Sequence, residues 1–133
     1  MTPEGLTSHR SRFDPAETKR RLEAAVTERG ISVLARIDHA AAASKAGMEL
    51  RPTAVLIFGN PRAGTPLMQA AQTLGIDLPL RALVWQDADG ATWLAYNEPT
   101  WLASRHGVAE EHERILAAMA DGLAAIAKEA TGA

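Results

Sequence analysis

Two stretches of the chain have the residue pattern of β-strands. Apolar residues occupy every second position over residues 31–38 (ISVLARID), as expected for a strand with one buried face. Residues 53–58 (TAVLIF) are apolar on both faces, which is typical of a central strand. The sequence therefore predicts a half-buried strand followed by a central one.

Two further strands are predicted as a hairpin. Residues 80–86 and 92–96 are rich in apolar and aromatic residues and flank the Asp-rich loop that ends at Gly90. If residues 88–90 form a three-residue loop with Gly90 left-handed, Trp85 lies opposite Trp93. The two indoles then form a cross-strand pair on one face of the sheet.

Helical spacing and helix-end residues predict five helices. Asp14-Pro15 has the features of a helix start, and Gly30 those of a helix end. Thr65-Pro66 has the features of a second helix start, and the helix that follows it is predicted over residues 67–74. The other three predicted helices cover residues 39–46, 99–106 and 109–130.

The element order α-β-α-β-α-β-β-α-α predicts an α/β fold of the α+β type. Connections through helices suit parallel strand pairs, and the hairpin adds an antiparallel pair. We therefore expect a two-layer sandwich with a mixed four-stranded sheet. Residues 1–12, rich in Ser, Thr, Gly and Arg, are expected to be a flexible segment. Residues 13–133 are expected to form a single domain that includes the C-terminal helix 109–130.

Composition narrows the function classes. The chain has 133 residues, of which 47% are hydrophobic and 23% charged, so a folded core is expected. A net charge of −2 argues against binding to nucleic acid or an anionic membrane through bulk charge. There is no cysteine, which excludes disulfides and thiolate metal sites.

No cofactor and no metal site is expected. No signal or membrane-spanning segment is apparent, and the excess of arginine over lysine is typical of GC-rich bacteria, so we expect a bacterial, cytoplasmic protein.

The segment FGNPRAGTP is the main candidate binding site. It lies between a predicted strand and a predicted helix, where backbone N–H groups can hold an anion. Asn60, Arg62, Gly64 and Thr65 are its candidate ligand-binding residues. It lacks the spacing of a P-loop or a dinucleotide-binding loop. The alternative is a tight turn with no ligand.

Three more residues are candidates for the same site. His39 follows Asp38 at a predicted strand end, and Tyr96 and Asn97 end the hairpin. A small molecule or anion bound beyond the strand ends would meet these groups. Alternatively, His39 begins the following helix and Asn97 caps the helix at Pro99.

Two other functions remain open on the sequence alone. An enzyme would use His39 or His106 as an acid–base group. A protein without catalysis would serve only for interaction, because both faces of the predicted sheet carry large apolar residues. A homodimer is the expected way to cover the second face. The alternative is a monomer in which the C-terminal helix covers that face.

Several runs of residues resemble a known family. IFGNPRAGTPLM and IDLPLRALVW, together with ARIDHAAAASKAG upstream, are similar to the signature of domain-of-unknown-function family 302. The resemblance covers roughly residues 8–108 and leaves out the helix that begins near Glu110. It implies a two-layer α/β sandwich with a mixed sheet, and a homodimer. It implies no reaction, cofactor or catalytic residue.

Overall fold

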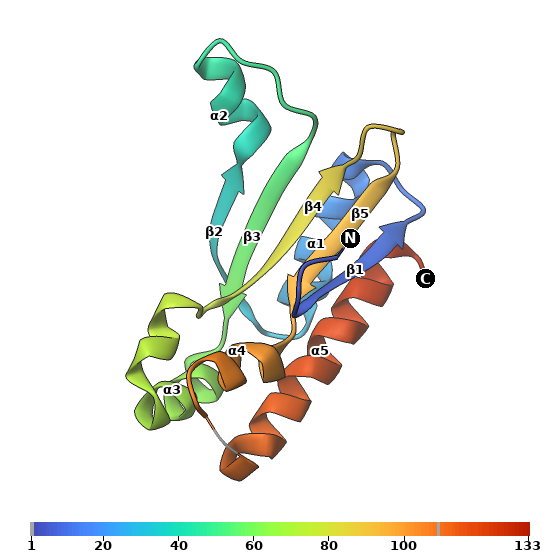
Figure 1. Ribbon diagram of the computed structural model, residues 1–133. Coiled ribbons are helices and arrows are strands. Elements are labelled where there is room, and N and C mark those ends of the chain that lie inside the picture. Colours follow the sequence, from blue (N-terminus) through green and yellow to red (C-terminus); the bar gives the residue numbers. More distant parts are fainter. Residues whose placement is uncertain (1, 109) are drawn as a thin grey trace.

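A five-stranded sheet and five α-helices make up the fold. The computed structural model describes residues 2–108 and 110–133. The sheet has the strand order β1-β5-β4-β3-β2 (Figure 1). The strands are β1 (Leu6–Ser11), β2 (Ser32–Asp38), β3 (Thr53–Gly59), β4 (Leu80–Gln86) and β5 (Thr92–Asn97). The helices are α1 (Pro15–Glu28), α2 (His39–Lys45), α3 (Pro61–Ala70), α4 (Pro99–Arg105) and α5 (Glu113–Thr131), with two 3-10 helices, η1 (Gln72–Ile76) and η2 (Glu110–His112).

The prediction of a mixed four-stranded sheet is wrong, because all neighbouring strands are antiparallel. From the sequence, the segments after β2 and β3 are expected to be crossovers between parallel strands. In the structure, α2 and α3 lie beyond opposite ends of the sheet, and after each of them the chain returns antiparallel to the strand before it (Figure 1). The ends of β2 and β3 therefore lie at opposite ends of the sheet.

The expectation of a flexible segment over residues 1–12 is also wrong. Residues Leu6–Ser11 form β1, which pairs with β5 along its whole length. The sequence LTSHRS is mostly polar, so it lacks the apolar alternation that identifies a strand. Backbone pairing with β5 orders this segment, and the Thr7 hydroxyl adds a hydrogen bond of 2.6 Å to the Glu98 carboxylate.

The segment around β1 is joined to the rest of the fold at both of its ends. Gly5 has a φ of 79°, and a side chain there would overlap the ring of Trp101. Only glycine combines that backbone angle with that close approach. After β1, the Arg12 N–H donates to the Thr131 carbonyl at 3.0 Å, at the end of α5. Residues 5–12 are thus an integral part of the domain.

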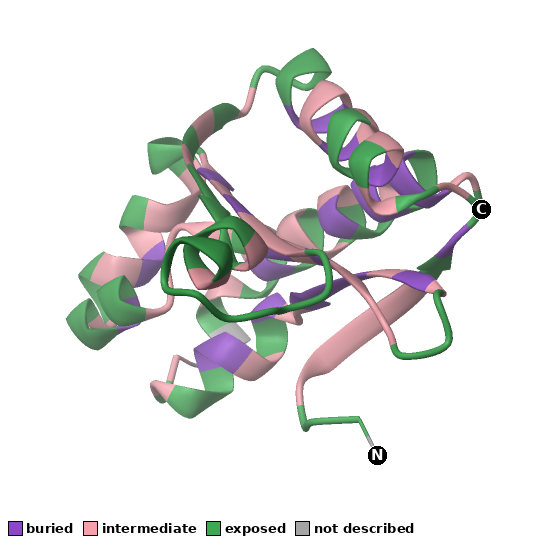
Figure 2. Cartoon of the chain, turned by 90° about the horizontal axis from the view of Figure 1, so that it is seen from above, coloured by how far each residue is buried: buried purple, intermediate pink, exposed green. Residues whose placement is uncertain are grey.

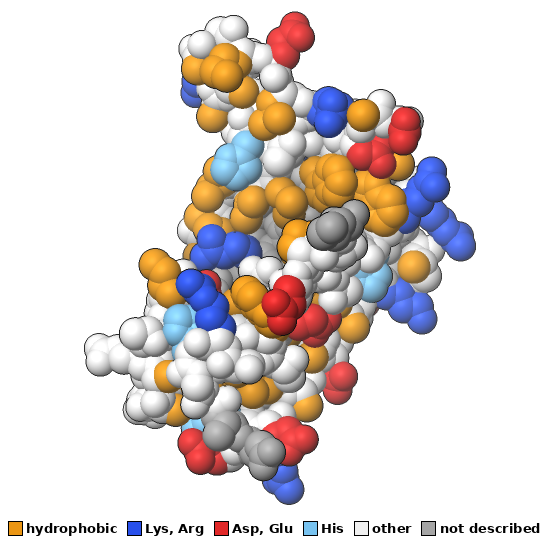
Figure 3. All heavy atoms as spheres, in the orientation of Figure 1, with side chains coloured by type: hydrophobic (Ala, Val, Ile, Leu, Met, Phe, Trp, Pro, Cys, Tyr) orange, Lys and Arg blue, Asp and Glu red, His pale blue; other side chains and the backbone are white. Residues whose placement is uncertain are grey.

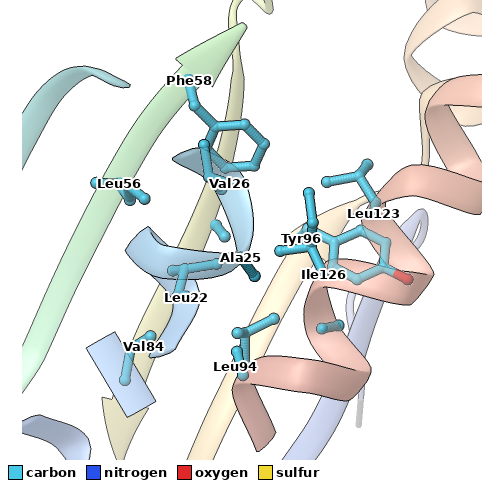
Figure 4. Close-up of a cluster of buried hydrophobic side chains, with 13 residues drawn as sticks. Leu22, Ala25, Val26, Leu56, Phe58, Val84, Leu94, Tyr96, Leu123 and Ile126 are labelled. Carbon is cyan, nitrogen blue, oxygen red and sulfur yellow. The ribbon is translucent and has the colours of Figure 1, made fainter. Parts of the chain in front are cut away.

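The main core lies between the sheet and two helices on one of its faces. Figures 1 and 2 show α1 and α5 side by side on that face. Buried side chains from both helices meet Leu56 and Phe58 of β3, Val84 of β4 and Leu94 and Tyr96 of β5 (Figure 4). This arrangement of two layers is the coarse architecture that the sequence predicts.

A second, smaller core lies beyond the end of the sheet. The N-terminal half of α5 packs there with α3, η1 and α4, and Leu67, Leu74, Leu102 and Leu116 are buried together. The predicted helix 109–130 corresponds to η2 and α5, except that residue 109 lies outside the described residues.

The helix after β3 begins earlier than the sequence analysis predicts. A helix is predicted over residues 67–74, after Thr65-Pro66. In the structure α3 begins at Pro61, because Asn60 caps it, and Pro66 lies inside the helix. The chain leaves the helix after Ala70 and continues as η1. Most of the expected FGNPRAGTP loop is therefore the first two turns of α3.

The opposite face of the sheet carries apolar side chains without a helix over them. The hairpin register confirms the predicted pairing of Trp85 with Trp93, whose rings stack with centroids 6.3 Å apart. Gly90 is left-handed, with a φ of 85°. Val55 and Leu83 share this face with the two indoles and are half-buried. We call this surface the open face; Figure 3 shows hydrophobic side chains gathered across it.

Candidate functional site

A cavity of about 630 Å³ opens between α5 and the end of the sheet at which β3 leads into α3. We call it the α3–α5 cavity, and Figure 1 shows the elements that form its walls. Its volume lies within the range of about 300–1,000 Å³ in which proteins bind small molecules. The α5 wall consists of Ile115, Ala118, Met119, Gly122, Leu123 and Ile126. The opposite wall combines residues 31, 32 and 34 with 58–65, 68 and 78–80.

All polar side chains of the cavity lie on the wall opposite α5. They are Ser32 at the start of β2, Asn60 directly after β3, and Arg62 and Thr65 on α3. Of the residues that the structure describes, Arg62 is the only charged one in the lining, and it makes no ion pair with any of the others. The cavity is thus apolar on one wall and carries a single positive charge on the other.

Asn60 occupies the N–H groups that an anion would need. Its side-chain oxygen accepts from the Arg62 N–H at 3.0 Å. Its backbone carbonyl accepts from the N–H groups of Ala63 and Gly64 at 3.0 and 3.1 Å. Pro61, the first residue of the helix, has no N–H. The start of α3 therefore hydrogen-bonds to itself, and any charge recognition in the cavity depends on side chains.

Small residues on α5 keep the cavity open. A Cβ atom at Gly122 would meet no described atom within 4 Å, and Ala118 lies one turn before it on the same wall. Glycine in a helix interior costs roughly 0.5–1 kcal/mol relative to alanine. Nothing in the packing requires the missing side chain at Gly122, so its effect is to leave space.

The structure separates the seven predicted site residues into two groups. Asn60, Arg62, Gly64 and Thr65 all line the α3–α5 cavity. His39, Tyr96 and Asn97 do not line it. For His39 the reason is the antiparallel sheet, which places the end of β2 and the end of β3 at opposite ends of the molecule (Figure 1).

His39 makes no contact with the neighbouring carboxylate that would orient it. Asp38 instead caps α2 by accepting from the Ala41 N–H at 2.9 Å. His39 is the first residue of this helix and is exposed. The alternative interpretation of His39, as part of a helix start, is therefore the one that the structure supports.

Tyr96 and Asn97 lie on opposite faces of β5. Tyr96 is buried in the main core (Figure 4). Its ring stacks on His9, with centroids 5.8 Å apart. Burial raises the pKa of the Tyr96 hydroxyl, and the charge of Glu98 raises it further. Asn97 does not cap the helix that follows, because Glu98 occupies the cap position of α4.

His106 belongs to a hydrogen-bonded cluster outside the cavity. Its Nε2 lies 2.5 Å from the Asp77 carboxylate, and its Nδ1 lies 2.8 Å from the Thr73 hydroxyl. Arg105 also donates to Asp77, at 2.7 Å. The cluster joins the end of α4 to η1. Burial of the Asp77 carboxyl raises its pKa, but the hydrogen bonds from His106 and Arg105 outweigh this effect and leave the pKa lowered.

Comparison with known proteins identifies the family. Residues 7–126 match the family described as "Domain of unknown function DUF302". The chain belongs to the DUF302 family. The match extends well into α5. The resemblance seen in the sequence motifs covers only residues 8–108 and does not include this helix.

A solved DUF302 structure shares the fold, and other proteins share the sequence. The crystal structure of an uncharacterized conserved DUF302 protein from Bacillus stearothermophilus superposes with a TM-score of 0.84 at 22% identity, covering 96% of this chain and 99% of that one. Proteins named fluoride-specific ion channel FluC 1 from Brucella suis and Brucella abortus are 44% identical over 128 residues, which is 96% of this chain. The chain spans about half the length of these relatives, 50% and 47% respectively. Within residues 2–108 and 110–133, no helix has both the length and the apolar character needed to cross a bilayer.

The contribution of α5 to the cavity of this DUF302 domain is not predicted from the sequence. The helical stripe that includes Ile115, Met119 and Ile126 has the spacing of a core-facing surface. Ile126 is buried, but Ile115 and Met119 are only half-buried because the helix runs past the sheet. The available signal was Gly122, an interior glycine in an otherwise strong helix-forming segment.

We predict that Asp77→Asn lowers stability in a pH-dependent way. Because the Asp77 pKa is lower in the folded protein than in the unfolded chain, the ionised carboxylate stabilises the fold at neutral pH. This stabilisation is lost as the pH falls through the lowered pKa. The substitution should reduce the free energy of unfolding by about 1 kcal/mol at pH 7, with a smaller difference at pH 3.

Urea denaturation at a series of pH values measures this difference. Asp121→Asn on the exposed side of α5 is the control, since Asp121 makes no ion pair with the described residues. An equal effect of Asp77→Asn at pH 7 and pH 3 would contradict the assignment.

Proposed function

We propose that this DUF302 domain binds a small, mostly apolar molecule in the α3–α5 cavity. The observation that carries the proposal is a cavity of about 630 Å³ in which α5 contributes only apolar residues and glycine to one wall, and the other wall carries a few polar groups. This combination is typical of sites for small ligands, in which apolar area supplies affinity and polar groups fix orientation. The FGNPRAGTP segment contributes through its side chains, as the polar wall.

The apolar lining gives such a ligand its binding energy. Apolar surface removed from water contributes about 25 cal/mol per Å². Ile115 and Met119 are only half-buried without a ligand, so an apolar molecule lying against them would remove further area from water.

A cavity-filling variant tests this proposal. Gly122→Phe directs a ring from the α5 wall toward the cavity, and a Cβ atom at this position would meet no described atom within 4 Å. We expect the neutral fluorescent probe N-phenyl-1-naphthylamine to bind the native chain saturably and the variant at least tenfold more weakly. Ala124→Phe, on the exposed side of the same helix, should bind as the native chain does. Unchanged binding to Gly122→Phe, or no saturable binding to the native chain, would refute the proposal.

A second candidate function is interaction through the open face. Val55, Leu83, Trp85 and Trp93 lie side by side there across β3, β4 and β5. Contiguous apolar surface of this kind marks interaction sites in soluble proteins. We propose that a second copy of the chain covers it, since twofold dimers are the commonest assemblies.

The mass in solution tests the dimer. Sedimentation equilibrium at micromolar concentration should give about twice the 14.2 kDa of one chain. Leu83→Lys should reduce the mass to that of a monomer, because it places a charge in the centre of the open face. Ile76→Lys, at an exposed apolar residue on η1, is the control and should remain dimeric. A monomeric native chain would refute the dimer.

We also propose that the two halves of the Brucella relatives have different functions. Their name assigns them fluoride conduction, and this chain matches about half of each. A conducting path through a bilayer needs membrane-spanning elements, and the described part of this chain contains no helix suited to that role. The proposal is that this half is a domain outside the membrane that accompanies the channel.

Fluoride efflux from vesicles tests that division. A Brucella relative without the half matched by this chain should still conduct fluoride, and the matched half alone should not. Conduction by the matched half alone, or loss of all conduction in a correctly inserted remainder, would contradict the proposal.

A further inference from the structure

We infer that the molecule bound in the α3–α5 cavity is a free medium-chain fatty acid, with its carboxylate beside Arg62 and its alkyl chain along α5. This inference rests on the proposed function, since it assigns a chemical class to the ligand of the same cavity.

Charge is the first observation that selects a carboxylate. Among the residues that the structure describes, Arg62 is the only charged one that lines the cavity, and no described aspartate or glutamate accompanies it there. Its guanidinium makes no ion pair with a described residue. A guanidinium matches the two oxygens of a carboxylate in geometry as well as in charge.

The hydroxyl of Thr65 adds a second donor on the same wall. Arg62 and Thr65 are three residues apart on α3 and therefore share one face of the helix. The backbone N–H groups at the start of α3 are already hydrogen-bonded to Asn60. A head group at this end of the cavity is thus recognised by these two side chains, and a negatively charged acceptor suits both.

The α5 wall selects a linear apolar chain. From Ile115 to Ile126 the wall contains only apolar residues and glycine over 11 residue steps, or about 16 Å at 1.5 Å per residue. The small residues Ala118 and Gly122 lie between the larger ones and leave a continuous trough. An extended alkyl chain of medium length can lie along such a trough. Because the opposite wall offers one cationic side chain, Arg62, we assign a free fatty acid with a single carboxylate as the occupant.

Calorimetric titration with three eight-carbon compounds tests the head group. Octanoate, 1-octanol and octyltrimethylammonium have the same chain and differ in charge. We expect octanoate to bind at least fivefold more tightly than octanol, and octyltrimethylammonium to bind most weakly. Burial of each added methylene is expected to tighten binding about fourfold. Decanoate has two more methylenes than octanoate and should therefore bind about fifteenfold more tightly.

Two arginine variants locate the charge recognition. Arg62→Gln should weaken octanoate binding about fivefold and leave octanol binding unchanged. Arg81→Gln is the matched control, because Arg81 is also exposed but lies outside the cavity lining. It should leave both affinities unchanged.

Each outcome decides a different question. Equal binding of all three compounds would overturn the fatty-acid assignment and leave the proposed function intact. An equal effect of the two arginine variants would also overturn it, since attraction would then come from general surface charge. No binding of any compound to the native chain, together with no binding of the neutral probe, would overturn both.

Discussion

The length of α5 relative to the sheet determines where everything else in this domain lies. The helix has 19 residues and is about 28 Å long at 1.5 Å per residue, whereas strands of 6 or 7 residues span about 20–24 Å. Its C-terminal half packs on the sheet with Leu123, Ile126 and Ala130 in the main core. Its N-terminal half extends past the sheet, where α3, η1 and α4 pack against it. The α3–α5 cavity lies where these two packing environments meet.

The same geometry leaves the other face of the sheet uncovered. Both long helices pack on one side, so the apolar rows of β3, β4 and β5 on the second side have no helix of their own (Figures 1 and 3). The cavity and the open face therefore have one origin, and they lie in different places. A ligand in the cavity and a partner on the open face would not compete.

The parts of the fold that depend on local pattern were predictable from the sequence. The strands with apolar alternation, the Trp85–Trp93 register and the helix start at Asp14-Pro15 depend on neighbouring residues, and the structure contains all of them. The polar strand β1 was missed because its order comes from pairing with β5, about 90 residues away. The strand directions were wrong for a related reason. Nothing within a short helix such as α2 shows whether the chain crosses the sheet or turns back at its end.

Only the wall of the candidate site that comes from one continuous stretch of sequence was predictable. Asn60, Arg62, Gly64 and Thr65 are neighbours in sequence, and one strand–helix junction holds them together. His39 was added on the assumption that successive strand ends meet at one edge, which holds for parallel strands only. The α5 wall comes from the far end of the chain, and its contribution required knowledge of how far α5 extends beyond the sheet.

Asn60 has a consequence for how such a site could diversify. Its side chain and carbonyl hold the first turns of α3 together without help from any ligand. The helix therefore keeps its position whatever occupies the cavity, and residue 62 projects from a frame that is already complete. A change of side chain there would alter which molecules are accepted without unsettling the scaffold. The residue that stabilises the start of α3 and the residue that we propose to select the ligand are thus two positions apart, and one could change without the other.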